Sequence, residues 1–326
     1  MNTKINTTES SPNNAIAFLQ VVNSCNQKCV FCNRPPSEDI NQRINIVDIK
    51  KNIKEFSKNK NIRTLVFTGG ETLLYPKLSE AVKYAKKLHF KIGMQTNGSL
   101  LHTQIKELKD AGLEKIYFAF HSHKKHISCK IRGTNYGFEK INDNLKLASK
   151  MGFDIHIIHV INSQNYQDMP EFVDYIHELN LKKFWLNFSL IVPEGWAWDN
   201  KWIIPRYIKV KPFLIKAMRK CDEYNLDFDV SETVPLCIVE GYEEHAISTL
   251  FKIRDIKIID EYMTGNRILD FINPSNDYAS KAPQCQDCKL NNICAGFYSR
   301  IKELYGVSDF IPFTGDPTPI LKRIIN

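Results

Sequence analysis

The chain has 326 residues, of which 43% are hydrophobic and 25% are charged, as in a globular protein with a sizeable buried core. No apolar run approaches the roughly 18 residues that span a bilayer, and residues 1–14 are a polar tail without the apolar segment of a secretory signal, so we expect a cytoplasmic protein with no membrane partner. The net charge of +8 suits an acidic partner, but no long basic run carries interleaved aromatic residues, which disfavours nucleic acid.

In chain order, short apolar runs alternate with amphipathic patterns. The predicted strands are 15–22, 62–69, 91–97, 115–120, 153–161 and 182–190, and the predicted helices between them are 46–59, 76–88, 103–112, 138–152 and 167–180. Near-continuous apolar strands are typical of parallel sheets covered on both faces. Six such units predict an α/β fold, either an open doubly wound sheet or a partial barrel. In both, ligands bind at the carboxyl ends of the strands.

The pattern changes after residue 190, where a segment rich in Pro, Gly and Trp reads as a loop and a helix follows at about 211–225. We place a domain boundary near residue 205. The expected organisation is a tail at 1–14, a core at 15–205 and a C-terminal extension at 206–326. With 14 residues before the first predicted strand, we expect no N-terminal leader-binding domain.

Three cysteines, Cys25, Cys29 and Cys32, lie within eight residues directly after the first predicted strand. A structural zinc ion takes four ligands, and the neighbouring Asn33 is a poor fourth ligand for a soft site. Three thiolates on a four-iron cube instead leave one iron open to a substrate or cofactor. The spacing therefore favours a reactive iron–sulfur site.

The C-x3-C-x2-C spacing, with Phe31 before the last cysteine, resembles the radical S-adenosylmethionine (SAM) superfamily. Further segments at successive strand ends resemble it too: TGGETLLYP (68–76), QTNGSLL (95–101), HSHKKHISCKIRGT (121–134) and HVINSQN (159–165). Each is a common turn sequence or polar rim by itself, so their order carries the resemblance. It covers residues 15 to about 190 and implies a partial (β/α)6 barrel of the TIM type.

The resemblance also implies roles for individual residues. Cys25, Cys29 and Cys32 would bind a [4Fe–4S] cluster whose open iron takes the amino and carboxylate groups of SAM. The residues that the resemblance places around SAM are Phe31, Gly69, Gly70, Glu71, Thr96, Asn97, Ser122, Arg132 and Asn162. The backbone of the Gly-Gly-Glu segment would hold the methionine ammonium, and Arg132 would pair with the carboxylate.

The implied chemistry is reductive cleavage of SAM to a 5′-deoxyadenosyl radical, which abstracts hydrogen from a peptide or small metabolite to oxidise, crosslink or epimerise it. Within the superfamily, the alternatives are a sugar or aminoglycoside dehydrogenase and a nucleoside- or RNA-modifying enzyme. Outside it, the alternative is a non-catalytic zinc or iron–sulfur module. The expected partner is an acidic electron donor such as flavodoxin or ferredoxin.

A second group of cysteines has C-x2-C-x5-C spacing at Cys285, Cys288 and Cys294, and Cys237 would complete a set of four. Spacing alone suits zinc and iron–sulfur equally. The group is similar to the SPASM and shorter twitch extensions of radical SAM enzymes, which carry auxiliary [4Fe–4S] clusters. A full SPASM domain has another cysteine where this chain has Tyr298, so the resemblance implies a truncated extension with one auxiliary cluster.

The remaining cysteines have different expected roles. Cys129 lies near the expected pocket and is our catalytic candidate, as a hydrogen-atom donor to a product radical. The alternative for Cys129 is an inert loop thiol. Cys221 lies in a helical pattern and is expected to pack. We interpret His121 and His123 as a polar rim.

Overall fold

The computed structural model describes residues 15–36, 45–135, 137–254, 256–262, 265–269 and 278–325. All six predicted strands are present, each within a few residues of its expected bounds. They are β1 (Ala15–Val22), β2 (Ile62–Gly69), β3 (Lys91–Thr96), β4 (Lys115–Ala119), β5 (Asp154–Ile161) and β6 (Phe184–Leu190).

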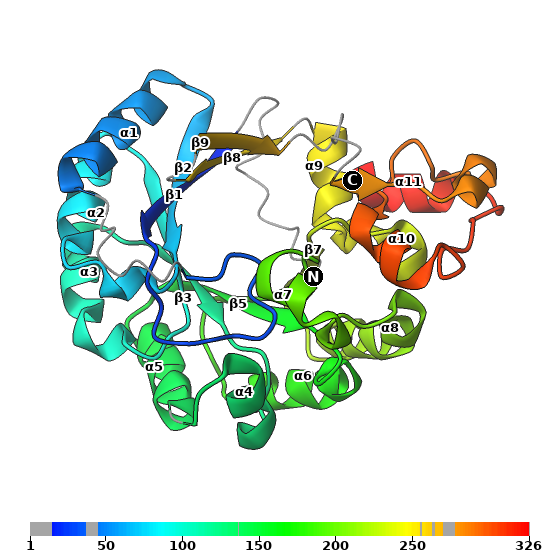
Figure 1. Ribbon diagram of the computed structural model, residues 1–326, viewed down its shortest axis with the longest axis horizontal. Helices are drawn as coiled ribbons and strands as arrows, with labels where there is room; N and C mark the ends of the chain where they lie inside the picture. The colour runs from blue at the N-terminus through cyan, green and yellow to red at the C-terminus, as the bar shows by residue number, and fades with distance from the viewer. Residues whose placement is uncertain are drawn as a thin grey trace.

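These strands lie in one curved sheet, as Figure 1 shows. Its order is β7-β6-β5-β4-β3-β2-β1-β8-β9, and every pairing from β7 to β8 is parallel. Only the last pairing, of β8 with β9, is antiparallel. The sheet therefore confirms the α/β partial barrel and excludes the open doubly wound alternative.

Three strands of this sheet were not predicted: β7 (Phe228–Ser231), β8 (Lys257–Tyr262) and β9 (Gly265–Leu269). They come from the proposed C-terminal extension, yet β7 pairs with β6 and β8 pairs with β1. Residues 206–326 therefore contribute to the barrel as well as to the region beyond it.

Helices cover the outer face of the sheet (Figure 1). They are α1 (Ile46–Lys58), α2 (Leu78–Lys87), α3 (Ile105–Ala111), α4 (Lys125–Arg132), α5 (Phe138–Lys150), α6 (Met169–Glu178) and α8 (Tyr207–Glu223). The short α7 (Gly195–Asp199) lies apart from them, next to the loop of the N-terminal cysteines, where Trp196 N–H donates to the Cys32 carbonyl at 2.8 Å. The Asn45 side chain caps α1 by accepting from the Val47 N–H, and Gly112 ends α3 at a φ of 102°. Helix α4 was not predicted.

The rest of the chain packs beside the open edge of the barrel, at the right of Figure 1. It contains α9 (Ile247–Arg254), a two-stranded sheet of β10 (Ala279–Ser280) and β11 (Phe297–Tyr298), α10 (Ser299–Tyr305) and α11 (Thr318–Ile325). Within the described ranges, no helix has both the length and the apolar character needed to cross a membrane.

Candidate functional site

The three N-terminal cysteines lie on the loop that follows β1, and this loop is attached to the end of α4. Lys28 N–H donates to the Arg132 carbonyl at 3.0 Å, and Val30 N–H donates to the Ile131 carbonyl at 2.9 Å. Cys32 N–H closes the loop on the Cys29 carbonyl at 3.0 Å. The unpredicted helix α4 therefore fixes the backbone that carries the thiols.

The loop borders a cavity of about 270 Å³ at the carboxyl ends of the strands, which we call the cysteine cavity. Eight of the predicted site residues line it: Cys25, Cys29, Phe31, Cys32, Gly69, Gly70, Thr96 and Asn97. They come from three separate stretches of sequence, which parallel strands bring to one edge of the sheet.

Gly69 and Gly70 bring the end of β2 against the backbone of the cysteine loop. Gly70 N–H donates to the Val22 carbonyl at 3.0 Å, and Glu71 N–H donates to the Ser24 carbonyl at 2.9 Å. A Cβ on Gly69 would lie 2.2 Å from the Val22 oxygen, and one on Gly70 would lie 2.2 Å from the Ser24 oxygen. Only glycine fits this contact.

Glu71 lies outside the cavity lining and connects the strand ends that form the cavity wall. Its side chain is fully buried and accepts from Thr96 Oγ1 at 2.7 Å, from Asn97 N–H at 2.7 Å and from Leu73 N–H at 3.1 Å. Burial raises the pKa of this carboxyl, which those hydrogen bonds oppose. Glu71 therefore joins the end of β2 to the end of β3 and positions Thr96 and Asn97.

Arg132 is a fully buried cation beneath the cysteine loop. One Nη donates to Gln27 Oε1 at 2.9 Å, and the other donates to the Ala119 carbonyl. Its Nε is buried with no partner in the described part of the chain. Burial lowers the pKa of Arg132, and its charge interacts with Cys29 and Glu71. An unpaired buried donor on a cation is suited to an anionic ligand group.

Arg132 does not line the cysteine cavity, and neither do three further predicted residues. Ser122 Oγ accepts from Lys124 N–H at 3.0 Å, and buried Asn162 Oδ1 accepts from Gln164 N–H at 3.0 Å, so both side chains are bonded within their own loops. Cys129 lies on α4 and is partly exposed. It lines neither the cysteine cavity nor the larger cavity inside the barrel. Its role as hydrogen-atom donor stays a prediction without support from the geometry.

His121 takes the place in the cavity wall that we expected for Ser122. Its ring meets Phe31 edge-on at 4.8 Å between centroids, and its Nδ1 accepts from Val160 N–H at 3.1 Å. Burial holds the pKa of His121 well below its usual value. The neutral ring therefore carries its proton on Nε2.

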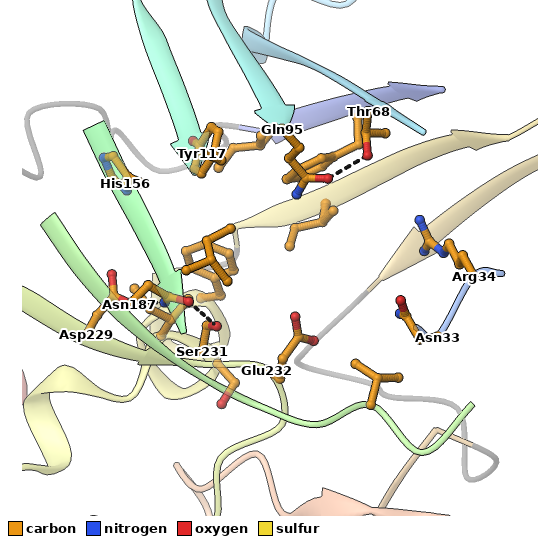
Figure 2. Close-up of a pocket in the computed structure, with 18 of the residues that line it drawn as sticks. Asn33, Arg34, Thr68, Gln95, Tyr117, His156, Asn187, Asp229, Ser231 and Glu232 are labelled. Atoms are coloured by element: carbon orange, nitrogen blue, oxygen red, sulfur yellow. Dashed lines mark hydrogen bonds between the residues drawn. The ribbon is translucent and has the colours of Figure 1, made fainter. Parts of the chain in front are cut away.

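A second, larger cavity of about 460 Å³ lies inside the barrel, and we call it the inner cavity. Figure 2 shows polar side chains pointing into it from several strands, with Thr68 Oγ1 donating to Gln95 Oε1 at 2.5 Å and Ser231 Oγ to Asn187 Oδ1 at 2.9 Å. Both cavities are lined by Asn33, Arg34, Gln95, Tyr117, Ile158, Val192 and Glu232. The two spaces are therefore adjacent.

The sequence analysis did not find the residues of the inner cavity. A usable signal existed for some of them, because Gln95, His156 and Asn187 are polar residues inside mostly apolar strands. Asp229 and Glu232 gave no such signal, since β7 is only four residues long.

Residues 19–176 match the family model described as the radical SAM superfamily. The chain contains a radical SAM domain. Enzymes of this superfamily use a [4Fe–4S] cluster and SAM.

Relatives of this radical SAM protein differ in name. It is 28% identical over 170 residues to a probable GTP 3′,8-cyclase of Saccharolobus islandicus, a match that covers 52% of this chain and 54% of the relative. The chain thus spans about half the length of that relative. It is 24% identical over 315 residues to a tungsten-containing aldehyde ferredoxin oxidoreductase cofactor-modifying protein of Pyrococcus furiosus, covering 85% of this chain and 88% of that protein.

Solved structures support the fold. Streptococcus suis SuiB bound to S-adenosylmethionine superposes with a TM-score of 0.65 at 14% identity, covering 94% of this chain and 77% of SuiB. The structure of native anSMEcpe with bound AdoMet has a TM-score of 0.61 at 16% identity, covering 95% of this chain and 96% of anSMEcpe. Both superpositions cover most of this chain, which supports the overall fold.

The residues of the cysteine cavity fit a cluster with SAM. Burial raises the pKa of the Cys25 thiol to about 11 and of the Cys29 thiol to about 12. Metal binding to cysteine releases the thiol proton. The glycine contact leaves backbone at the cavity wall, and the unpaired Nε of Arg132 is a donor for a carboxylate.

The four C-terminal cysteines lie in one region of the structure. The charge of Cys237 interacts with those of Cys294 and Cys285, and Cys285 interacts with Cys288. Backbone N–H groups donate to Cys294 Sγ from Leu236 at 3.5 Å and from Gly296 at 3.3 Å, and to Cys288 Sγ from Phe313 at 3.4 Å. Such donors stabilise metal-bound thiolates. Across the described residues, no three His, Cys, Asp or Glu side chains converge closely enough to hold a single metal ion.

Proposed function

We propose that this radical SAM enzyme binds its cluster and SAM in the cysteine cavity and abstracts hydrogen from a peptide or small-metabolite group in the inner cavity. The observation that carries the proposal is the shared wall of the two cavities, which joins the predicted cofactor residues to a polar space inside the barrel. When bound, the reduced cluster and SAM supply a 5′-deoxyadenosyl radical.

The chain's own residues have separate tasks in this proposal. Cys25, Cys29 and Cys32 would hold the cluster. The backbone at Gly69 and Gly70 would accept from the ammonium of SAM, since a carbonyl oxygen is the acceptor that an ammonium needs. Arg132 would donate through Nε to the carboxylate of SAM. The barrel wall would keep water from the reacting carbon.

The inner cavity supports a substrate group of modest size. Its volume lies in the range of small-molecule sites, which suits a metabolite or one side chain of a peptide. Its many hydrogen-bonding side chains favour, as a second candidate, a polyhydroxylated substrate such as a sugar or aminoglycoside. The names of the relatives point to a nucleotide and to a metal cofactor, and SuiB was solved with a precursor peptide, so similarity does not choose the substrate.

For the C-terminal cysteines, we propose one auxiliary [4Fe–4S] cluster in a truncated SPASM or twitch-like extension, with zinc as the alternative. Metal analysis of a chain in which Cys25, Cys29 and Cys32 are all alanine separates the two. An auxiliary cluster would leave about four iron ions per chain, whereas a zinc site would leave one zinc ion. The proposed electron donor is a small acidic redox protein, which the basic surface would attract.

Anaerobic reconstitution tests the function. We expect iron and sulfide to be incorporated and 5′-deoxyadenosine to be released from SAM on reduction. A Cys29→Ala variant should lose that release, while Cys221→Ala, in the packed interior of α8, should keep it. Release by the Cys29→Ala variant would refute the assignment of the cluster.

A further inference from the structure

Glu232 occupies a distinctive place between the two cavities. It lines both of them, and Figure 2 shows its carboxylate directed into the inner cavity. Its φ of 73° lies in the left-handed region, which a residue with a side chain adopts only when its surroundings enforce it. Backbone strain of this kind is concentrated at functional sites. Neighbouring residues must therefore hold Glu232 in this conformation.

A contact from the C-terminal region holds this carboxylate. Tyr298 on β11 is buried and donates its hydroxyl to Glu232 Oε2 at 2.6 Å. The hydroxyl of Tyr278, another residue of the inner cavity wall, lies 3.2 Å from that of Tyr298. Tyr298 is also the residue that stands where a full SPASM domain has a further cysteine.

The two partners of this hydrogen bond are each tied to the C-terminal cysteines. Glu232 precedes Cys237 by five residues, and Tyr298 follows Cys294 by four. The two segments also touch directly, because Leu236 N–H donates to Cys294 Sγ at 3.5 Å. A metal centre that binds Cys237 and Cys294 together would therefore fasten the segment of Glu232 to the segment of Tyr298.

We propose that the C-terminal cysteine site is a positioning device for Glu232. A metal centre held by Cys237, Cys285, Cys288 and Cys294 fixes Tyr298, and Tyr298 fixes the Glu232 carboxylate at the boundary of the two cavities. This role is independent of whether the centre also carries electrons. It rests on the proposed function only for the identity of the molecules that meet at Glu232.

Hydrogen exchange measured by mass spectrometry on the full chain with its metals bound tests the coupling. Tyr298→Phe removes one hydroxyl and leaves all cysteines in place. We expect amide exchange in residues 229–236 to rise roughly tenfold, as expected when a hydrogen bond to a charged group is lost. Tyr305→Phe is the matched control, because it removes a hydroxyl that donates at 2.6 Å to the Ile204 carbonyl, away from Glu232. Unchanged exchange in Tyr298→Phe, or an equal rise in Tyr305→Phe, would overturn the proposal.

Coupling between two sites is reciprocal, so the metal must respond to the hydroxyl. We expect Tyr298→Phe to release the C-terminal metal to a chelator several-fold faster than the unmodified chain, and Tyr305→Phe to release it at the unmodified rate. Removing the metal with Cys285→Ala and Cys288→Ala should raise exchange in the same segment. Equal release rates from the Tyr298→Phe variant and the unmodified chain would refute the coupling.

The measurement of 5′-deoxyadenosine release separates this inference from the proposed function. If release is observed but exchange and metal loss do not respond to Tyr298→Phe, the positioning role fails and the function stands. If exchange and metal loss respond but no release is found, the positioning role stands and the function fails.

Discussion

Adding one methyl group at Gly70 should disable the cysteine cavity. In the Gly70→Ala variant, the new Cβ would lie 2.2 Å from the Ser24 oxygen, 2.6 Å from the Ser24 carbonyl carbon and 2.8 Å from the Asn23 oxygen. All three are backbone atoms just before Cys25, so no side-chain rotation relieves the contact. The φ of Gly70 does not require glycine, so the effect would be purely steric.

The magnitude follows from these distances. Cβ atoms essentially never approach other heavy atoms within 3.0 Å, so the loop must retreat by about 1 Å. The same Ser24 oxygen accepts from Glu71 N–H at 2.9 Å, and this hydrogen bond would break as the loop moves. Overpacking costs about 1–3 kcal/mol and the hydrogen bond about 1 kcal/mol. We expect a loss of roughly 2–4 kcal/mol in unfolding free energy. We also expect weaker SAM binding, because the displaced loop carries the cysteines and part of the cavity wall.

Urea unfolding and equilibrium binding of SAM to the reconstituted protein measure these two effects. Gly315→Ala serves as the control, because its Cβ would meet only the Phe313 side chain, at 2.9 Å, and that ring can move. The control should keep stability and SAM affinity. A Gly70→Ala variant with unchanged SAM affinity and an unchanged urea midpoint would show that the close backbone contact does not shape the site.

Three further substitutions test other parts of the site. Glu71→Gln places an amide NH₂ among three hydrogen-bond donors, so urea unfolding should show a loss of about 1–3 kcal/mol, and no loss would contradict the bonding described. Burial raises the pKa of Asp229 to about 7, whereas the pKa of an aspartate in the unfolded chain is about 4. Between about pH 4 and about pH 7 the folded state therefore keeps a proton that the unfolded state has released, so the unfolding free energy should fall as the pH rises through this range. Asp229→Asn should flatten that part of the stability profile and raise stability above pH 7 by a few kcal/mol; a profile identical to the unmodified chain would exclude Asp229 as its cause. Cys221→Ala should lower the unfolding free energy by about 1 kcal/mol with full iron content, and loss of iron would show that its role is more than packing.

The sequence predicted the barrel well where strands are long and apolar, as in β2, because burial on both faces leaves a nearly continuous hydrophobic run. It did not predict β7, whose four residues are too few for a periodic pattern and include Asp229. Helix α4 was missed because its sequence, KHISCKIR, is mostly polar and its helical state depends on packing against the cysteine loop.

For the site, the rule that ligands bind at the carboxyl ends of parallel strands brought together the cysteines, the two glycines and Thr96 with Asn97. The same rule does not decide which side chain at a strand end turns inward. Ser122 is engaged by the N–H two residues later, a local turn that competes with ligand binding, and the adjacent His121 faces the cavity instead. Motif order locates a loop, whereas the side-chain direction depends on hydrogen bonds that sequence does not specify.

The most important residue that the sequence analysis did not identify is Glu232, which lies beyond the domain boundary placed near residue 205. A barrel whose sheet ended at β6 would take its whole site from residues 15–205. Here β7 adds one more strand end, and the segment after it carries both a cavity carboxylate and, at Cys237, a cysteine of the C-terminal site. Because the same short segment belongs to the cavity wall and to the cysteine site, the extension cannot be removed without changing the barrel's own interior. Residues of the C-terminal region therefore form part of the wall of the inner cavity.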